Sequence, residues 1–217
     1  MQFDLFDARN NDILASATYA EFKERMANSN CQRCTLCAAR NNIVVDRGNP
    51  QSHIMAIGEG PGENEDLQGA AFVGRAGKLL DQILAAINLD TNRDILIANV
   101  VKCRPPENRQ PRPLEVASCK PFLQKQIELI KPRVILLLGA TALRHMAPAK
   151  QEFSMAEEAG KFFTLEEYPG IQFMVLYHPA FLLRDPRKKI DMWRHVKTLK
   201  TYLEENDLMP KKTASGN

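Results

Sequence analysis

The stretch HIMAIGEGPGENED, residues 53–66, joins an unbroken apolar run to a turn made of glycine, proline and acidic residues. The apolar run has the length and composition of a buried β-strand. Three later runs share these properties, and the four candidate strands are residues 53–58, 94–101, 133–139 and 172–177. Because their apolar residues are continuous and do not alternate with polar ones, they favour a parallel sheet that is covered on both faces.

Helical patterns separate these runs. Apolar side chains recur at helical spacing in residues 76–89 and again in residues 113–132. We expect two more helices, one around residues 19–27 and one from residue 190 to about residue 205. The alternation of strands and helices predicts an α/β fold of three layers, α/β/α, around a central, mainly parallel four-stranded sheet.

The composition is that of an ordinary soluble domain, with 217 residues, of which 44% are hydrophobic and 25% charged. We expect one domain over residues 1–208 and a polar, disordered tail at residues 209–217. No run approaches the roughly 18 apolar residues of a membrane helix, and the first residues lack the apolar core of an export signal. We therefore expect a cytoplasmic, monomeric protein with no membrane segment.

The net charge and the cysteine content do not single out one function. The net charge of +3 is compatible with a polyanionic partner without deciding for one. Five cysteines, an odd number in a reducing compartment, argue against a disulfide framework. They leave metal ligation, catalysis or inert burial.

Ligands of parallel α/β sheets bind at the carboxyl ends of the strands, so the residues after each strand are the most informative. The loop GEGPGENED fails the dinucleotide-binding pattern, because Glu63 stands where G-x-G-x-x-G needs glycine. The later stretch of residues 69–78 fails the P-loop pattern, because Arg75 stands where lysine is needed. The loop GEGPGENED carries four acids: Glu59, Glu63, Glu65 and Asp66. A helix N-terminus favours any one of them, but a loop so rich in glycine and proline indicates close approach to a ligand.

The other strand ends carry further candidates. The third strand ends in GAT, residues 139–141, and the last is followed by HPAFLLR, residues 178–184. A lone histidine is more often structural than functional, but the position of His178 at a strand end favours function. The basic residues at 184 and 187–189 form either a solvated face or a surface for phosphates.

The cysteines form a third group. CQRCTLC, residues 31–37, contributes a C-x-x-C pair and one more thiol, and Cys103 and Cys119 follow much later. Four thiolates suit either zinc or an iron–sulfur cluster. A zinc ribbon would have a second C-x-x-C, whereas fifteen residues separate Cys103 from Cys119. Spacing alone leans towards iron–sulfur and leaves inert buried thiols as an alternative.

Taken together, these motifs resemble the family 4 uracil-DNA glycosylases, the iron–sulfur branch of the uracil-DNA glycosylase superfamily, over about residues 31–203. The motifs are C-x-x-C before GNP (48–50), GEGPGENED, AFVGRAG (71–77), NVVKCRPPENR (99–109), Cys119 and HPAFLLR. The resemblance implies a uracil-DNA glycosylase-like fold and a monofunctional enzyme of base excision repair. Such an enzyme flips uracil out of single- or double-stranded DNA and hydrolyses its N-glycosidic bond, leaving an abasic site.

The resemblance also assigns roles. A structural [4Fe-4S] cluster is implied at four ligands, Cys31, Cys34, Cys103 and Cys119, while Cys37 packs beside it. His178 would donate to uracil O2, Asn99 would bond the O4/N3 edge, and Phe72 would stack on the base. The loop around Gly60 would bring backbone N–H groups close to the uracil.

Two assignments depend on less specific positions. Better-studied branches of the superfamily have Asp or Asn where Gly60 stands, so Glu59 and Glu65 are the candidates for the carboxylate that activates water. We expect a joint role, with Glu65 slightly ahead in aligning water and Glu59 shaping the loop. In the last motif, we expect an apolar wedge of Phe181, Leu182 and Leu183 to fill the vacated base stack and Arg184 to contact a phosphate.

Three alternative interpretations of the sequence are considered. A superfamily relative that cross-links to DNA carries a histidine-bearing insertion, which residues 101–113 lack. A non-catalytic iron–sulfur DNA-binding module would not need Glu59, Phe72, Asn99 and His178 together. A zinc-stapled nucleotide-binding protein would differ in its metal and sulfide content.

Overall fold

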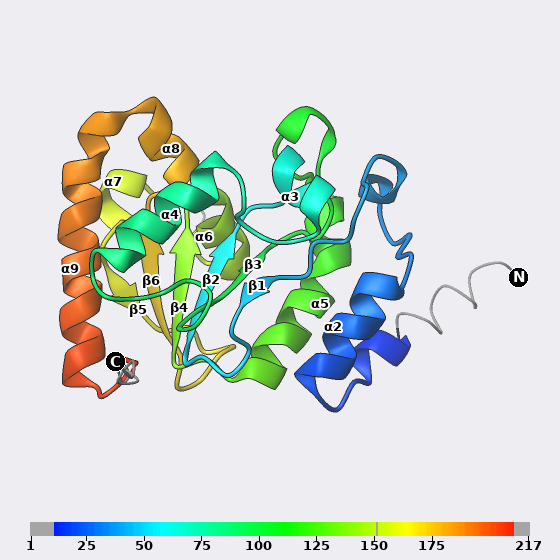
Figure 1. The fold of residues 1–217 in the computed structure, drawn as a ribbon, viewed down its shortest axis with the longest axis horizontal. Coiled ribbons are helices and arrows are strands. Elements are labelled where there is room, and N and C mark those ends of the chain that lie inside the picture. Colours follow the sequence, from blue (N-terminus) through cyan, green and yellow to red (C-terminus); the bar gives the residue numbers. More distant parts are fainter. Residues whose placement is uncertain (1–10, 151, 211–217) are drawn as a thin grey trace, which may run out of the picture.

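Four parallel strands form the centre of the sheet in the computed structural model, which describes residues 11–150 and 152–210 (Figure 1). They are β2 (Ile54–Gly58), β3 (Leu96–Asn99), β4 (Val134–Leu138) and β6 (Gln172–Leu176). Two short strands that the sequence did not predict, β1 (Arg47–Gly48) and β5 (Phe162–Phe163), pair antiparallel at the two edges. The order of the sheet is β1-β3-β2-β4-β6-β5, so the mainly parallel centre is confirmed and the full sheet has six strands.

Helices cover both faces of the sheet. The longer helices are α2 (Tyr19–Asn28), α4 (Arg75–Ala85), α5 (Pro113–Ile130) and α9 (Lys189–Glu205), and all four confirm the predicted helical segments. The shorter ones are α3 (Glu63–Gln68), α6 (Ala140–Met146), α7 (Met155–Glu158) and α8 (Pro179–Arg184), with 3₁₀ turns η1 (Thr35–Ala38), η2 (Pro106–Asn108) and η3 (Pro186–Lys188).

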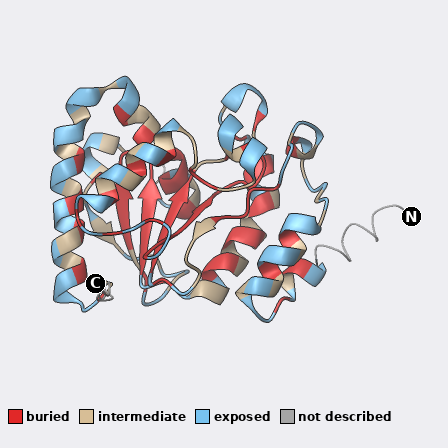
Figure 2. Cartoon of the chain, in the orientation of Figure 1, coloured by how far each residue is buried: buried red, intermediate tan, exposed pale blue. Residues whose placement is uncertain are grey.

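Successive strand residues face opposite helical layers, which explains why the strands are apolar throughout. In β4, Ile135 and Leu137 pack in one core with α2, α5 and α6, while Leu136 and Leu138 pack in the other with α4, α8 and α9. Figure 2 shows the central strands as uniformly buried and the outer helices as buried only on their inner side. The predicted three-layer architecture is thereby confirmed.

The strand register places the functional loops together. Gly58 of β2 pairs with Asn99 of β3, and Leu138 of β4 pairs with Leu176 of β6. All four strands therefore end at the same edge, and the loops that follow them emerge side by side. The predicted tail lies outside the described residues from 211 onwards, as do residues 1–10 of the predicted domain. No helix in the described part of the chain is long and apolar enough to span a membrane.

Candidate active site

A cavity of about 480 Å³ opens at the carboxyl edge of the sheet. Its walls come from the loops after β2, β3, β4 and β6. They include most of the predicted site residues: Glu59, Gly60, Glu65, Phe72, Asn99, His178, Phe181 and Arg184. Segments far apart in the sequence thus form one concave site, as the register of the parallel strands requires.

The loop after β2 lies close against its neighbours. A side chain at Gly58 would begin 2.6 Å from both Asn99 Oδ1 and the Phe72 ring, so only glycine fits there. The sheet pairing continues past the end of β2, because the N–H groups of Val100 and Val101 donate to the carbonyls of Gly58 and Glu59 at 2.9 and 3.2 Å. The backbone at Glu59 is therefore fixed by β3.

Asn99 lines the cavity and carries a buried, unsatisfied acceptor. Its side chain is 1% exposed, and its Oδ1 has no hydrogen-bond partner among the described residues. Its backbone carbonyl accepts a bond of 2.8 Å from the buried ammonium of Lys102, which fixes this end of β3. A buried acceptor without a partner costs free energy in the empty protein, and this cost is removed when a ligand donates to it.

Phe72 and His178 form one wall. Phe72 is 5% exposed, has a left-handed backbone with φ of 55°, and lies with its ring 5.7 Å from the His178 ring. Gly77 makes this conformation feasible, because a Cβ there would meet the Phe72 carbonyl at 1.7 Å. Left-handed backbone is uncommon for an aromatic residue, and such strain concentrates at functional sites.

The protonation state of His178 follows from its contacts. Its Nδ1 accepts the N–H of Ala180 at 3.1 Å, in the first turn of α8. Burial, and secondarily the charge of Arg184, lower the pKa of His178 to about 4. The ring is therefore neutral near pH 7, and because Nδ1 is an acceptor, its hydrogen lies on Nε2.

Glu59 and Glu65 differ in how many of their oxygens are occupied. Both oxygens of Glu65 accept backbone N–H groups, from Gly62 at 3.1 Å and from Gly74 at 2.7 Å. Glu59 accepts one side-chain hydrogen bond, at Oε2 from the hydroxyl of Thr141, and no protein donor reaches its Oε1 among the described residues. Glu65 thus holds the loop in place, while Oε1 of Glu59 is available to accept a hydrogen bond from a ligand.

Four of the five cysteines lie at the core between the sheet and α2 and α5. Cys103 and Cys119 are buried in the core shared with α2 and α5, and Cys31 and Cys34 pack against that core, whereas Cys37 is not part of it. Burial raises the pKa of the Cys103 thiol to about 12 and that of Cys119 to about 11. Two cations act against this rise in pKa. Arg40, which donates to Cys103 Sγ at 3.4 Å, lowers the pKa of Cys103, and Lys102 lowers that of Cys119.

Comparison with known proteins agrees with this geometry. The family model of the uracil DNA glycosylase superfamily matches residues 45–201. The chain is 44% identical to the type-4 uracil-DNA glycosylase of Saccharolobus solfataricus, over 72% of this chain and 74% of that one. It is also 44% identical to that of Thermotoga maritima, over 71% and 79%, and 41% identical to that of Archaeoglobus fulgidus, over 72% and 80%.

The chain belongs to the uracil-DNA glycosylase superfamily. The family resemblance found in its motifs is thereby confirmed. The match to the family model begins after Cys31 and Cys34 and includes every pocket residue of the preceding paragraphs. The three relatives named above are all named type-4 uracil-DNA glycosylases.

In this superfamily member, α8 divides the predicted wedge. Leu182 is completely buried in the core, so its prediction as part of a DNA-facing wedge was wrong. Three consecutive apolar residues look alike in sequence, but a helix turns them to different sides. Leu183 is 38% exposed, and Phe181 packs on Tyr177 with ring centroids 5.5 Å apart.

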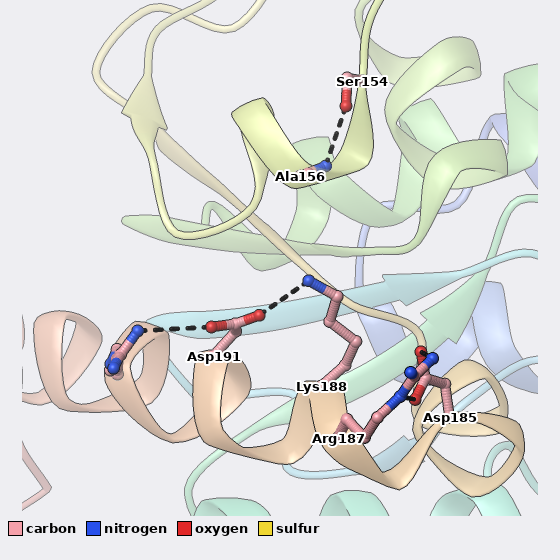
Figure 3. Close-up of polar contacts among 7 residues, drawn as sticks. Ser154, Ala156, Asp185, Arg187, Lys188 and Asp191 are labelled. Atoms are coloured by element: carbon pink, nitrogen blue, oxygen red, sulfur yellow. Dashed lines mark hydrogen bonds and ion pairs between the residues drawn. The ribbon is translucent and has the colours of Figure 1, made fainter.

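Two of the four residues of the basic run are already paired. Arg187 bonds Asp185 at 2.8 Å and Lys188 bonds Asp191 at 3.0 Å, as Figure 3 shows. Figure 3 also shows the neighbouring α7 cap, in which Ser154 accepts the N–H of Ala156. Within the described residues, Arg184 has no ion pair, and its side chain lines the cavity.

Sequence reasoning missed some of the residues that line the cavity. Thr141, Tyr177, Asn108 and Met155 are the main ones. Thr141 belongs to GAT, which follows a strand and so carries a positional signal, and Asn108 belongs to a motif of the family resemblance. Met155 begins α7 and has no such signal in the sequence.

Proposed function

We propose that this superfamily member is a monofunctional uracil-DNA glycosylase. It flips uracil from single- or double-stranded DNA and hydrolyses the N-glycosidic bond, leaving an abasic site that starts base excision repair. The observation that carries the proposal is one cavity with an unpaired acceptor at Asn99, a neutral donor at His178 and a carboxylate oxygen of Glu59. The type-4 names of its relatives support the same activity.

Asn99 accounts for the choice of base. Uracil presents a donor at N3 and an acceptor at O4, so Asn99 Oδ1 accepts the N3 hydrogen while its amide donates to O4. Cytosine presents an acceptor at N3 and a donor at N4. In the same pose it would leave Asn99 Oδ1 buried and unpaired, which costs about 1–3 kcal/mol per group. Phe72 stacks on the ring of the bound base.

His178 stabilises the leaving group. When the N1–C1′ bond breaks, its electron pair goes to uracil and charge develops on O2. The His178 ring is neutral and its Nδ1 is occupied by Ala180, so Nε2–H is the donor directed to that oxygen. Because the Ala180 bond fixes the ring beforehand, little reorientation is needed during the reaction.

Glu59 aligns the attacking water. The free Oε1 accepts a hydrogen from water, and the carboxylate charge faces the developing oxocarbenium ion of the sugar. Glu65 supports this by fastening Gly62 and Gly74. The geometry therefore favours Glu59 as the group that contacts water, with Glu65 shaping the loop, the reverse of the weighting expected from sequence.

The α8 segment accounts for DNA contact. The exposed side chain of Leu183 fills the stack that uracil leaves, with Phe181 supporting it, and Arg184 contacts a backbone phosphate. The backbone of Gly60 lies close enough to the cavity to approach the base. We further propose that the enzyme acts as a cytoplasmic monomer.

Cys31, Cys34, Cys103 and Cys119 would hold a structural [4Fe-4S] cluster. No three His, Cys, Asp or Glu side chains of residues 11–150 and 152–210 converge on a single metal ion. A four-iron cluster bonds one cysteine to each iron, so its ligands surround a larger group. Shared packing of the four thiols, with Arg40 and Lys102 to balance thiolate charge, fits that donor set.

The cluster would join the N-terminal segment to the loop after β3. Iron and acid-labile sulfide analysis tests this, with about four of each expected per chain. Cys103→Ser should lose the iron, and the matched Cys37→Ser should keep it. Zinc without sulfide, or equal loss in both variants, contradicts the ligand assignment.

Strand scission at uracil tests the activity. The purified protein is incubated with an oligonucleotide that contains one uracil, and alkali then cleaves any abasic site. We expect cleavage at uracil and none in matched strands with cytosine or thymine. The His178→Ala protein serves as the control for contaminating glycosylases. DNA binding without scission in any pairing would favour the non-catalytic binding module instead.

A further inference from the structure

Gly139 and the first turn of α6, which follow β4, have no role in the proposed function. Gly139 has φ of 90°, and a Cβ at this position would begin 2.9 Å from His178 Cβ. Its N–H donates to the Leu176 carbonyl at 2.9 Å, which fastens the turn to β6. Thr141 follows two residues later, is 5% exposed and lines the cavity. Gly139 therefore lies against His178, and the first turn of α6, which contains Thr141, lines the active site.

Thr141 reaches Glu59 from the side opposite to β3. Its hydroxyl donates to Glu59 Oε2. β2 lies between β3 and β4 in the sheet, so Glu59 is held from both neighbours. The segment after β3 holds its backbone through the Val101 N–H, and the first turn of α6, directly after β4, holds its carboxylate through Thr141.

We propose that Thr141 is a positioning residue for uracil excision, which orients the Glu59 carboxylate so that Oε1 faces the substrate. A glutamate side chain has three rotatable bonds, and a single fixed hydrogen bond at Oε2 selects the arrangement in which Oε1 meets the water. The hydroxyl itself does not contact substrate. This inference rests on the proposed function, because it assigns a partner to the group that aligns water.

Thr141→Val keeps the shape of the side chain and removes its donor. We expect kcat for uracil excision to fall at least about tenfold, the effect of losing a hydrogen bond to a charged group, with KM nearly unchanged. Thr141→Ser restores the donor and should recover most of the rate. If the valine variant folds poorly, Thr141→Ala removes the same donor without changing this expectation.

Thr91 provides a matched control. It is also buried, at 4% exposed, and its hydroxyl donates to a carboxylate, Asp81, at 2.7 Å. It precedes β3 and therefore lies at the opposite end of the sheet from the cavity. Thr91→Val should lower the melting temperature by a similar amount and leave kcat unchanged. A purely structural role for Thr141 would make the two variants behave alike in both measurements.

A double-mutant cycle with Glu59→Ala tests the route of the effect. If Thr141 acts through Glu59, adding Thr141→Val to Glu59→Ala causes no further loss of rate. Wild-type kcat in Thr141→Val, or full additivity of the two losses, would overturn the proposal. These outcomes differ from failure of the proposed function itself, in which the wild-type protein excises no uracil.

Discussion

Two buried carboxylates beside the cysteine segment, Asp66 and Glu115, are fully paired, whereas two polar side chains of the cavity, Asn99 and Glu59, are not. On the cysteine side, Asp66 accepts the backbone N–H groups of Asn41 and Asn42 at 2.9 and 3.1 Å and the Asn41 side chain at 2.6 Å. Glu115 accepts both nitrogens of Arg109 at 2.9 and 2.7 Å. In the cavity, Asn99 Oδ1 has no partner and Glu59 has one occupied oxygen within the described chain.

This difference distinguishes polar groups that hold the structure together from polar groups that are available to a substrate. Satisfied buried carboxylates tie segments together, as Glu115 ties Thr35 of the cysteine segment to the loop that contains Arg109. A buried polar group without a partner is a cost to folding that a protein can retain at a site where a ligand satisfies it. Changes on the cysteine side should therefore act first on stability, and changes in the cavity first on rate.

Asn99→Ala is expected to give the largest effect. Loss of the uracil contacts should lower kcat/KM for uracil excision by about 10²–10³-fold, typical of removing a preorganised polar contact to the reacting group. The free energy of unfolding should stay the same or rise, because the variant removes an unsatisfied buried acceptor. Single-turnover excision and urea denaturation measure the two quantities. A large loss of stability would place Asn99 with the supporting groups.

Glu115→Ala should produce the converse result. Glu115 is 2% exposed, and its removal strands the Arg109 guanidinium and two other donors, the Thr35 hydroxyl and the Arg112 N–H, so we expect a loss of about 3 kcal/mol in the free energy of unfolding. The control is Glu128→Ala on the same helix, whose carboxylate is 65% exposed and whose ion pair with Lys125 should contribute less than about 1 kcal/mol. Both variants are compared by denaturation at equal iron content. Equal losses in the two would contradict the comparison.

The sequence predicted the strands and the candidate site residues better than the contacts between those residues. The four long strands and the residues that follow them were readable because continuous apolar runs indicate parallel strands, whose ends form one edge. The two-residue strands β1 and β5 are too short to show a pattern. The contact of Thr141 with Glu59 depends on β4 lying beside β2, and chain order does not give sheet order. The different bonding of Glu59 and Glu65 depends on loop geometry, which has no periodic signal.

The titration of His178 gives a smaller effect. Its pKa is about 4 in the folded protein against an ordinary 6.5, chiefly because of burial. Between these two values the unfolded chain binds a proton that the folded chain does not, so the stability that neutral His178 contributes is present above pH 6.5 and is lost as the pH falls towards 4. Denaturation of wild type and His178→Gln across this range should show the wild-type advantage shrinking on acidification. A constant difference would mean that the ring is already charged or fully solvated.

The smallest expected effect concerns the basic run, where a paired and an unpaired arginine lie three residues apart. Arg184 lines the cavity without an ion pair in the described structure, whereas Arg187 is 90% exposed and bonded to Asp185. A phosphate contact releases about one counterion, so Arg184→Ala should lower the slope of log affinity against log salt by about one. Arg187→Ala should change the slope less, because Asp185 already neutralises that charge and would itself become unpaired. Fluorescence anisotropy with a short uracil-containing strand over a series of salt concentrations measures both slopes. An equal change in the two variants would show that local pairing does not decide which cation contacts DNA, and Arg184 would lose its assignment.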